Sequence, residues 1–312
     1  MLLTLSNYVP EHFTDIARFA GYQEQFRLSH YCQYIKEFIA ASLKDPNIDG
    51  VVLPNSCDCV RTAIDYIEKS DKYVYQLKHP TVNTEEAVRY FTVIIEQFKF
   101  TLEHYFHKTI TIEEISARTQ LITDRNSYLH NVYENAGSFS YGDYIGMINR
   151  MLNYPLSEWN GHISALSPKK QGKGVYVIGP FLANIALLSR MEKCGLTIMG
   201  DNLTNSKRLI TIPFPIKTDT LYEDIARSIL NECASPTMGR FNTLYEKDYQ
   251  EIIKKDIKGV VFLCKKFCES YDYLFAYYQE RLQTVGIPII RVYTDDIEYE
   301  SNTIWETFYE MI

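Results

Sequence analysis

The chain has 312 residues, of which 46% are hydrophobic and 23% are charged, so it is long enough for two domains with a sizeable core. Its net charge of −7 argues against nucleic acid as the main partner, because phosphate binding needs basic stripes that the sequence lacks. The most apolar span, 175–188, is interrupted by Gly179 and Pro180 and is shorter than the ~20 residues of a membrane helix. The first residues carry no basic segment followed by an apolar one, so we expect a cytoplasmic protein without a membrane partner.

Apolar residues near the amino end fall at helical spacing and predict a helix over residues 10–21, ended by Gly21. A second helix is predicted from Tyr31 to Leu43, with Cys32 in its first turn. At that position the free N–H groups and the dipole of a helix favour a thiolate, which is the form that binds metals. The alternative interpretation is a cysteine buried as a small hydrophobic residue.

Residues 48–61, IDGVVLPNSCDCVR, are the most informative stretch of the chain. A β-branched run ends at Leu53 and Pro54, and a helical pattern opens after Asp58, so Cys57 is expected at the carboxyl end of a strand. Open α/β sheets bind ligands in the crevice at such ends. Residues 259–264 predict a second buried strand, and the turn after it carries Cys268. Both halves of the chain therefore offer cysteines at strand ends.

The remaining elements predict an α/β fold. Helical patterns over residues 84–105, 111–132 and 138–152 predict a helical cover on a small first sheet. Residues 155–174 lack periodicity, which places a domain boundary near residue 160. Beyond it, strands alternate with helices at 182–193, 222–230, 242–254 and 271–285, which predicts a parallel sheet. We predict two doubly wound, Rossmann- or flavodoxin-like domains: residues 1–160, with a helical insertion, and residues 161–312.

The chemistry that the residues indicate is that of thiols. Seven cysteines in a cytoplasmic chain are expected to be free thiols or metal ligands. If both halves face one crevice, Cys32, Cys57 and Cys268 converge there, and three thiolates suit an iron–sulfur cluster with one iron left open. The spacings of the cysteine pairs are not those of a zinc ribbon. Arg240 is a candidate to hold a carboxylate or phosphate, or else it fixes the backbone of its loop. No glycine-rich nucleotide fingerprint follows the strands.

Several motifs carry a family resemblance. Residues 51–61, VVLPNSCDCVR, resemble the strand and cysteine–aspartate turn of the 2-hydroxyacyl-CoA dehydratase and benzoyl-CoA reductase superfamily. Residues 6–11 resemble its amino-terminal motif, residues 29–34 its first cluster cysteine, and residues 267–268 its last. Residues 286–295 and 306–311 are similar to its carboxyl end, so the resemblance, to a 2-hydroxyglutaryl-CoA dehydratase D-component-like subunit, covers nearly the whole chain.

The resemblance implies a [4Fe–4S] cluster bound by Cys32, Cys57 and Cys268 in the crevice between the two domains. It implies a dimer with a related subunit or with a second copy, and a separate ATP-dependent activator that delivers one low-potential electron. The substrate would be an acyl-CoA, which in the dehydratases loses a hydroxyl group through a ketyl radical. We therefore expect an oxygen-sensitive lyase of anaerobic metabolism, or a reductase. The alternatives are a non-catalytic or electron-relay partner subunit and a cluster-free α/β binding protein.

The sequence departs from the family pattern at a few positions. Asn7 stands where many members carry a cysteine, and His12 stands where a glutamate is usual, so His12 is a candidate catalytic residue. Some relatives carry a double-cubane cluster, which needs about six thiols. Cys233 matches one of their extra positions, whereas Leu203 replaces another. The reserve ligands for this alternative are Cys59, Cys233 and Cys264.

Overall fold

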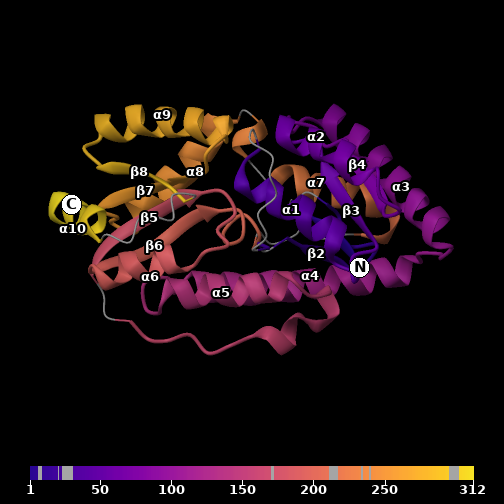
Figure 1. The fold of residues 1–312 in the computed structure, drawn as a ribbon, viewed down its shortest axis with the longest axis horizontal. Coiled ribbons are helices and arrows are strands. Elements are labelled where there is room, and N and C mark those ends of the chain that lie inside the picture. Colours follow the sequence, from indigo (N-terminus) through magenta and orange to yellow (C-terminus); the bar gives the residue numbers. More distant parts are fainter. Residues whose placement is uncertain are drawn as a thin grey trace.

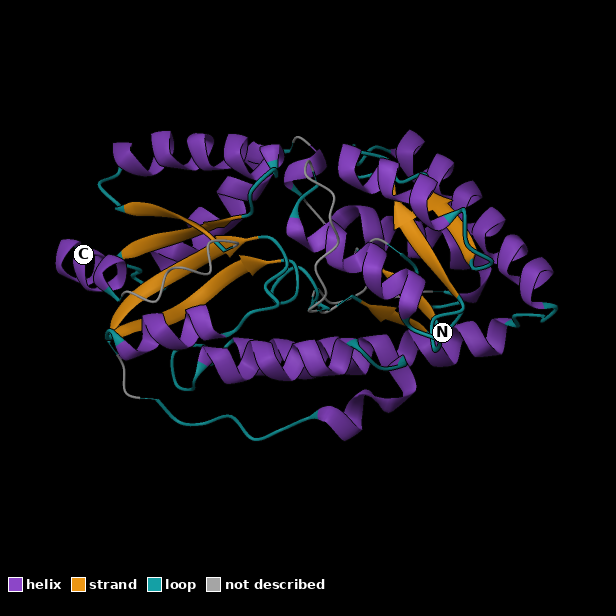
Figure 2. Ribbon diagram, in the orientation of Figure 1, coloured by secondary structure: helices purple, strands orange, loops and turns teal. Residues whose placement is uncertain are grey.

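The structure is a computed structural model that describes residues 1–5, 9–19, 21–22, 31–169, 172–210, 217–232, 235–238, 240–294 and 302–312. Two α/β units lie side by side, each built on a four-stranded parallel sheet (Figure 1). Helices surround both sheets (Figure 2), and α4 (Ile112–Tyr133) and α5 (Tyr141–Leu152) run along the lower side of the molecule in the view of Figure 1. The α/β fold class with two doubly wound sheets, as predicted from the sequence, is confirmed.

The first sheet has the strand order β2-β1-β3-β4. Its strands are β1 (Leu2–Thr4), β2 (Ile16–Arg18), β3 (Gly50–Pro54) and β4 (Tyr73–Leu77). Val51 and Leu53 pack against α1 (Gln33–Lys44) and α2 (Asp58–Ile67). Val52 faces the other side, against α3 (Glu85–Phe106) and α7 (Leu221–Glu232). Because successive side chains of a strand point to opposite faces, this run of apolar residues requires helices on both sides of the sheet.

The second sheet repeats this order as β6-β5-β7-β8. Its strands are β5 (Lys173–Gly179), β6 (Leu196–Leu203), β7 (Gly259–Cys264) and β8 (Ile289–Tyr293). Tyr176 and Val260 pack against α8 (Phe241–Lys254) and α9 (Glu269–Thr284). Val177 and Val261 face a larger core on the other side. That core contains residues of α4 (Ile112–Tyr133), α5 (Tyr141–Leu152), α6 (Ala186–Lys193), α10 (Thr303–Met311) and the 3-10 helix at Leu156–His162.

Two helical segments pack against the sheet that is more distant in sequence. Helix α7 follows β6 in the chain, and yet Ile225 and Leu230 belong to the core of the first sheet, beside α3. Helix α4 bridges the units, because Ile115 packs with the first core and Leu129 with the second. Helix α5 packs wholly with the second core. The division of the chain at residue 160 stays a prediction. Helix α7 lies after this residue and packs with the first core, whereas α5 lies before it and packs with the second.

The helix predicted over residues 10–21 is wrong in the described part of that range. Ile16–Arg18 form strand β2 instead, in which Ala17 pairs with Leu3 of β1. All residues of this short strand are buried. Phe13, Ile16 and Ala17 are apolar at a spacing that suits a helix, but three consecutive buried residues form an edge strand equally well. Only the pairing with β1, which the local pattern does not contain, decides between the two.

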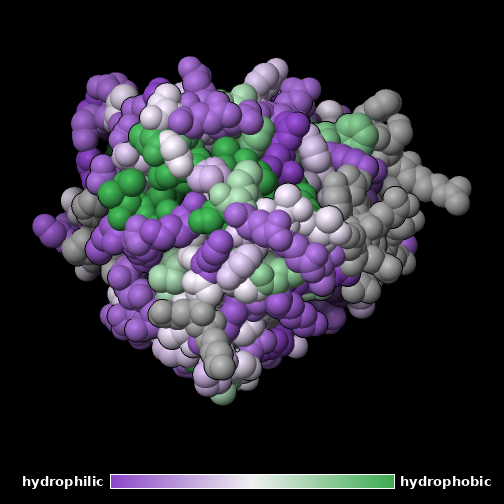
Figure 3. Space-filling view, turned by 90° about the vertical axis from the view of Figure 1, so that its left-hand side faces the viewer, coloured by the Kyte–Doolittle hydropathy of each residue, from purple (hydrophilic) through white to green (hydrophobic). Residues whose placement is uncertain are grey.

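Apolar side chains gather on one end of the second unit, where they form the green area of Figure 3. Val285, just beyond α9, is 45% exposed, and Met311 at the end of α10 is 54% exposed. Ile289 and Ile290 of the edge strand β8 are half-buried. Among the described helices, none combines the length and apolarity that crossing a bilayer requires.

Candidate functional site

Residues that follow strands of both sheets line one cavity of about 140 Å³. Leu5 comes just after β1 and Cys57 after β3, while Pro180 follows β5 and Cys268 follows β7. The strand order reverses between β1 and β3 in one sheet and between β5 and β7 in the other. Open α/β sheets bind ligands at this switch point. Here the switch points of the two sheets open into the same cavity, so the two halves of the chain contribute to a single site.

Three cysteines occupy equivalent positions around this cavity. Cys32, Cys57 and Cys268 are the N-cap residues of α1, α2 and α9. No sulfur completes a capping hydrogen bond, but the backbone N–H three residues further along each helix lowers the pKa of the preceding thiol. Helix N-termini carry partial positive charge and stabilise anions. The cavity thus joins three thiols to three helix ends that favour negative charge on them.

In the protein chain alone these thiols hold their protons. Burial raises the pKa of Cys57, and it raises the pKa of Cys268 to about 12. The pKa of Cys32 lies well above its ordinary value, because its thiol donates a hydrogen bond to Cys59 and because it is buried. The same bond lowers the pKa of Cys59 to about 6. In the chain alone these effects favour a protonated Cys32 and make Cys59 the more acidic thiol of the pair. A metal removes the proton from a thiol that coordinates it, so protonated thiols remain possible ligands.

The other cysteines differ in position. Cys59 lies in the first turn of α2 beside Cys32. Cys264, the last residue of β7, is fully buried in the core under α8 and α9 and does not line the cavity. Cys194 caps the end of α6 and packs against the other core of that unit. Cys233 lies outside the described residues.

The two candidate catalytic residues do not line the cavity. His12 is buried, neither ring nitrogen has a partner among the described residues, and burial lowers its pKa to about 4. Arg240 is the N-cap residue of α8, and its charge adds to the effect of burial in lowering the pKa of His79. A catalytic role for His12 or Arg240 stays a prediction.

Two cations in the cavity were not found from the sequence. Arg208 follows β6 and Lys265 follows β7, and both line the cavity together with Tyr271. None of the described lining residues is an aspartate or glutamate. The rings of Tyr34 and Phe181 stack with their centroids 5.1 Å apart and join the two units at the cavity wall. In the sequence, only the position of Arg208 shortly after a predicted strand indicates that it lies near a ligand crevice.

The chemistry of the three cavity thiols is compatible with a cluster. Within the described residues, no three histidine, cysteine, aspartate or glutamate side chains come together closely enough to hold one ion. A cubane cluster has its iron atoms at separate corners, and each thiolate binds a different one, so the ligands surround a volume. Cys32, Cys57 and Cys268 are soft ligands that surround such a volume.

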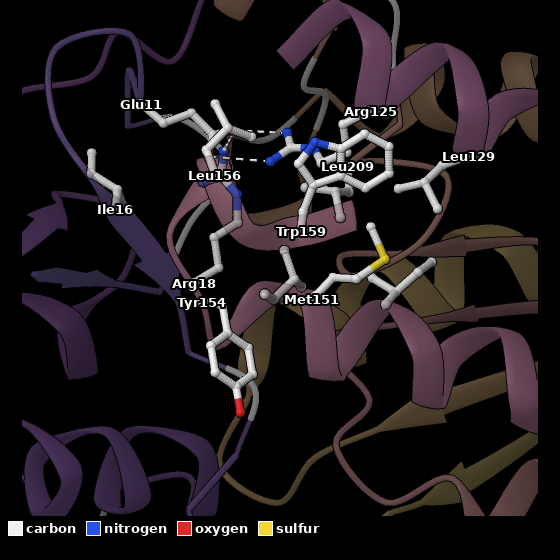
Figure 4. A pocket seen from close by; sticks show the side chains of 12 residues that line it. Glu11, Ile16, Arg18, Arg125, Leu129, Met151, Tyr154, Leu156, Trp159 and Leu209 are labelled. Atoms are coloured by element: carbon white, nitrogen blue, oxygen red, sulfur yellow. Dashed lines mark hydrogen bonds and ion pairs between the residues drawn. The ribbon is translucent and has the colours of Figure 1, made fainter. Parts of the chain in front are cut away.

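A second, smaller cavity lies beside Glu11 and is shown in Figure 4. Arg18 and Arg125 both pair with Glu11 at its edge, and Met151 and Trp159 form part of its apolar wall. Its volume of about 10 Å³ leaves space for at most one water molecule. This cavity therefore supports the fold and does not receive a substrate.

The fold and the cavity lined by Cys32, Cys57 and Cys268 define a two-unit α/β protein with thiols at facing switch points. The family model of 2-hydroxyglutaryl-CoA dehydratase, D-component, matches residues 20–312, and the chain belongs to this family. It is also 27% identical over 142 residues to the (R)-phenyllactyl-CoA dehydratase beta subunit of Clostridium sporogenes. That match covers 43% of this chain and 36% of the relative, so the chain spans about a third of the relative's length. The superfamily predicted from the sequence is confirmed.

Proposed function

We propose that this chain is the iron–sulfur subunit of a 2-hydroxyacyl-CoA dehydratase-like enzyme, with Cys32, Cys57 and Cys268 as the ligands of one [4Fe–4S] cluster. The observation that carries the proposal is the set of three N-cap thiols, drawn from both units, around one cavity. When bound, the cluster would supply the low-potential electron that turns a 2-hydroxyacyl-CoA into a ketyl radical, which no side chain can supply.

The chain itself would hold and shield the reacting groups. The three helix N-termini stabilise negative charge at the thiols. Leu5, Ile35, Val60 and Phe181 line the cavity with apolar surface, which limits the access of water. Because the thiols come from both units, the relative position of the two sheets fixes the spacing of the ligands. The chemistry of the site thus depends on the packing that joins the units.

The proposal includes partners. The relative from Clostridium sporogenes is described as a beta subunit, which supports a dimer with a related subunit or with a second copy of this chain. A separate ATP-dependent activator would deliver the electron, and an acyl-CoA would be the substrate. A cytoplasmic location and oxygen sensitivity belong to the same proposal.

The position of Cys59 favours a second candidate, a double-cubane reductase or an electron-relay subunit of the same superfamily. Cys59 accepts the hydrogen bond of Cys32, and its lowered pKa makes it the most readily ionised thiol near the cavity. A larger cluster would need it as a ligand together with further thiols. Cys264 is a poor further ligand, because it is enclosed in the core.

Serine substitutions separate these candidates. Cys32→Ser, Cys57→Ser and Cys268→Ser are each expected to lower the iron and sulfide content of anaerobically purified protein severalfold, because one of three anchors is lost. Cys194→Ser is the matched control and should keep the wild-type content, since Cys194 lies at the end of α6 away from the cavity. Loss of iron in Cys59→Ser as well would favour the larger cluster. Full iron content in all three cavity variants would refute the ligand assignment.

A further inference from the structure

Arg208 lines the cavity that contains Cys32, Cys57 and Cys268. Contacts with β5, β6 and α9 fix the position of its guanidinium. We propose that Arg208 raises the reduction potential of the cluster held by Cys32, Cys57 and Cys268, so that it tunes the site and does not merely support the fold. The proposal rests on the function proposed above. It assigns Arg208 an electrostatic role, in which the positive charge of its guanidinium acts on the cluster.

The contacts of Arg208 hold its guanidinium in one place. Its Nη2 donates to the carbonyl oxygen of Gly179 at the end of β5, and to that of Asn202 in β6 at 3.0 Å. The same nitrogen donates to the hydroxyl of Tyr271 in α9 at 2.6 Å. The guanidinium carbon also lies 5.8 Å from the centroid of the Tyr271 ring. Arginine stays protonated in proteins, so this arrangement is a permanent positive charge beside the cavity.

Tyr271 connects this charge to the helix that carries the last thiol. Its backbone N–H donates to the carbonyl oxygen of Cys268 at 3.1 Å, in the first turn of α9. Its hydroxyl donates to the carbonyl oxygen of Gly179 at 3.0 Å while it accepts from Arg208. The side chain of Tyr271 is 5% exposed, so water does not compete freely for these bonds. The distance between Arg208 and the Cys268 helix turn is thereby set by one buried side chain.

The sign of the effect follows from charge. A cluster bound by three thiolates is anionic, and its reduction takes one electron from a mediator and adds one more negative charge, without a bond or proton change. The net charge around a cluster is one of the factors that set its potential. No aspartate or glutamate is among the described lining residues, so Arg208 is closer to the cavity than the carboxylates of Asp58 and Asp272, which act on Cys57 and Cys268 from outside the lining. Lys265 also lines the cavity, where its ammonium lies 3.4 Å from the hydroxyl of Thr294.

A redox titration of the anaerobic protein with a low-potential viologen mediator, followed by visible absorbance and electron paramagnetic resonance, tests the proposal. Arg208→Gln is expected to lower the ratio of reduced to oxidised cluster about tenfold at a given potential, which is about 59 mV for a one-electron couple. Arg208→Lys keeps the positive charge, so its reduction potential should lie close to that of the wild type. Tyr271→Phe removes one contact that positions Arg208 and should shift the potential in the same direction by less.

Lys254→Gln is the matched control, because it removes one positive charge from an exposed position on α8. A potential in Arg208→Gln equal to that of the wild type would overturn the proposal, and so would an equal shift in Lys254→Gln. If Arg208→Gln does not retain iron, Tyr271→Phe decides, and an unchanged potential there overturns the proposal. Wild-type protein without a cluster contradicts the proposed function instead, and the iron content shows this before any variant is measured.

Discussion

Glu11→Gln is the substitution whose effect on stability follows most directly from the structure. Glu11 accepts hydrogen bonds from Arg18 Nη2 at 2.8 Å and from Arg125 Nη2 at 2.7 Å (Figure 4). The three side chains are between 5% and 7% exposed. Burial alone would raise the pKa of Glu11, but Arg125 and Arg18 more than offset it and lower that pKa from 4.5 to about 2. A drop of this size corresponds to ~3 kcal/mol of stability at neutral pH.

The substitution leaves two buried guanidinium groups without their shared carboxylate. Removing one partner of a buried ion pair costs about 3–5 kcal/mol, which agrees with the figure from the pKa. The free energy of unfolding in urea at pH 7 measures this loss. Glu86→Gln is the control, because Glu86 pairs with Arg89 at 2.9 Å with its side chain 76% exposed. Loss of that solvent-exposed pair should leave the free energy of unfolding nearly unchanged.

The same substitution changes the acid limb of the stability curve. A lowered carboxyl pKa stabilises the fold fully above the ordinary value of 4.5, and this stability is lost as the pH falls from 4.5 towards 2. His12, whose pKa burial lowers from 6.5 to about 4, destabilises both proteins as the pH falls through that earlier window. Because the charge of Glu11 raises the pKa of His12, Glu11→Gln also lowers the pKa of His12 further. We therefore expect Glu11→Gln to remove the Glu11 contribution to the acid limb below pH 4.5 and to move the His12 contribution to lower pH. A loss under ~1 kcal/mol at pH 7, or an unchanged acid limb, would refute the reasoning.

Two further substitutions test the packing of the second sheet. Tyr176→Phe removes a buried hydroxyl that donates to Asp248 at 2.9 Å, and should lower the unfolding free energy in urea by ~1–3 kcal/mol while the iron content stays unchanged. Gly179→Ala would place a Cβ 2.8 Å from the Cβ of Leu263, and should cost ~1–3 kcal/mol by the same assay. Gly161→Ala, whose Cβ would meet no atom within 4 Å, is the control and should change the free energy by less than ~0.5 kcal/mol.

Local patterns were sufficient for strand β3, for the strands of the second sheet and for part of the site. The β-branched run before Cys57 and the helical pattern after Asp58 gave the correct order of strand, turn and helix, because both elements lie within one short segment. The alternation of strands and helices after Val175 likewise gave the parallel sheet. These features depend on side-chain periodicity, which the sequence contains directly.

Features that depend on contacts between distant segments were not predictable in this way. Strand β2 exists because it pairs with β1, and α7 covers the first sheet although it follows β6 in the chain. The hydrogen bond between Cys32 and Cys59, which raises the pKa of Cys32, joins residues of two helices. The role of Arg208 depends on strand ends and a helix that only the folded chain brings together.

The central claim is that the facing switch points hold one iron–sulfur cluster. The most direct test is the iron and acid-labile sulfide content of the wild-type chain, purified without oxygen, together with its visible spectrum. We expect brown protein with roughly four iron and four sulfide per chain, because three surrounding thiolates select a cubane cluster. A content of roughly eight iron would indicate the double-cubane alternative. Colourless protein, or protein with stoichiometric zinc and no sulfide, would contradict the claim.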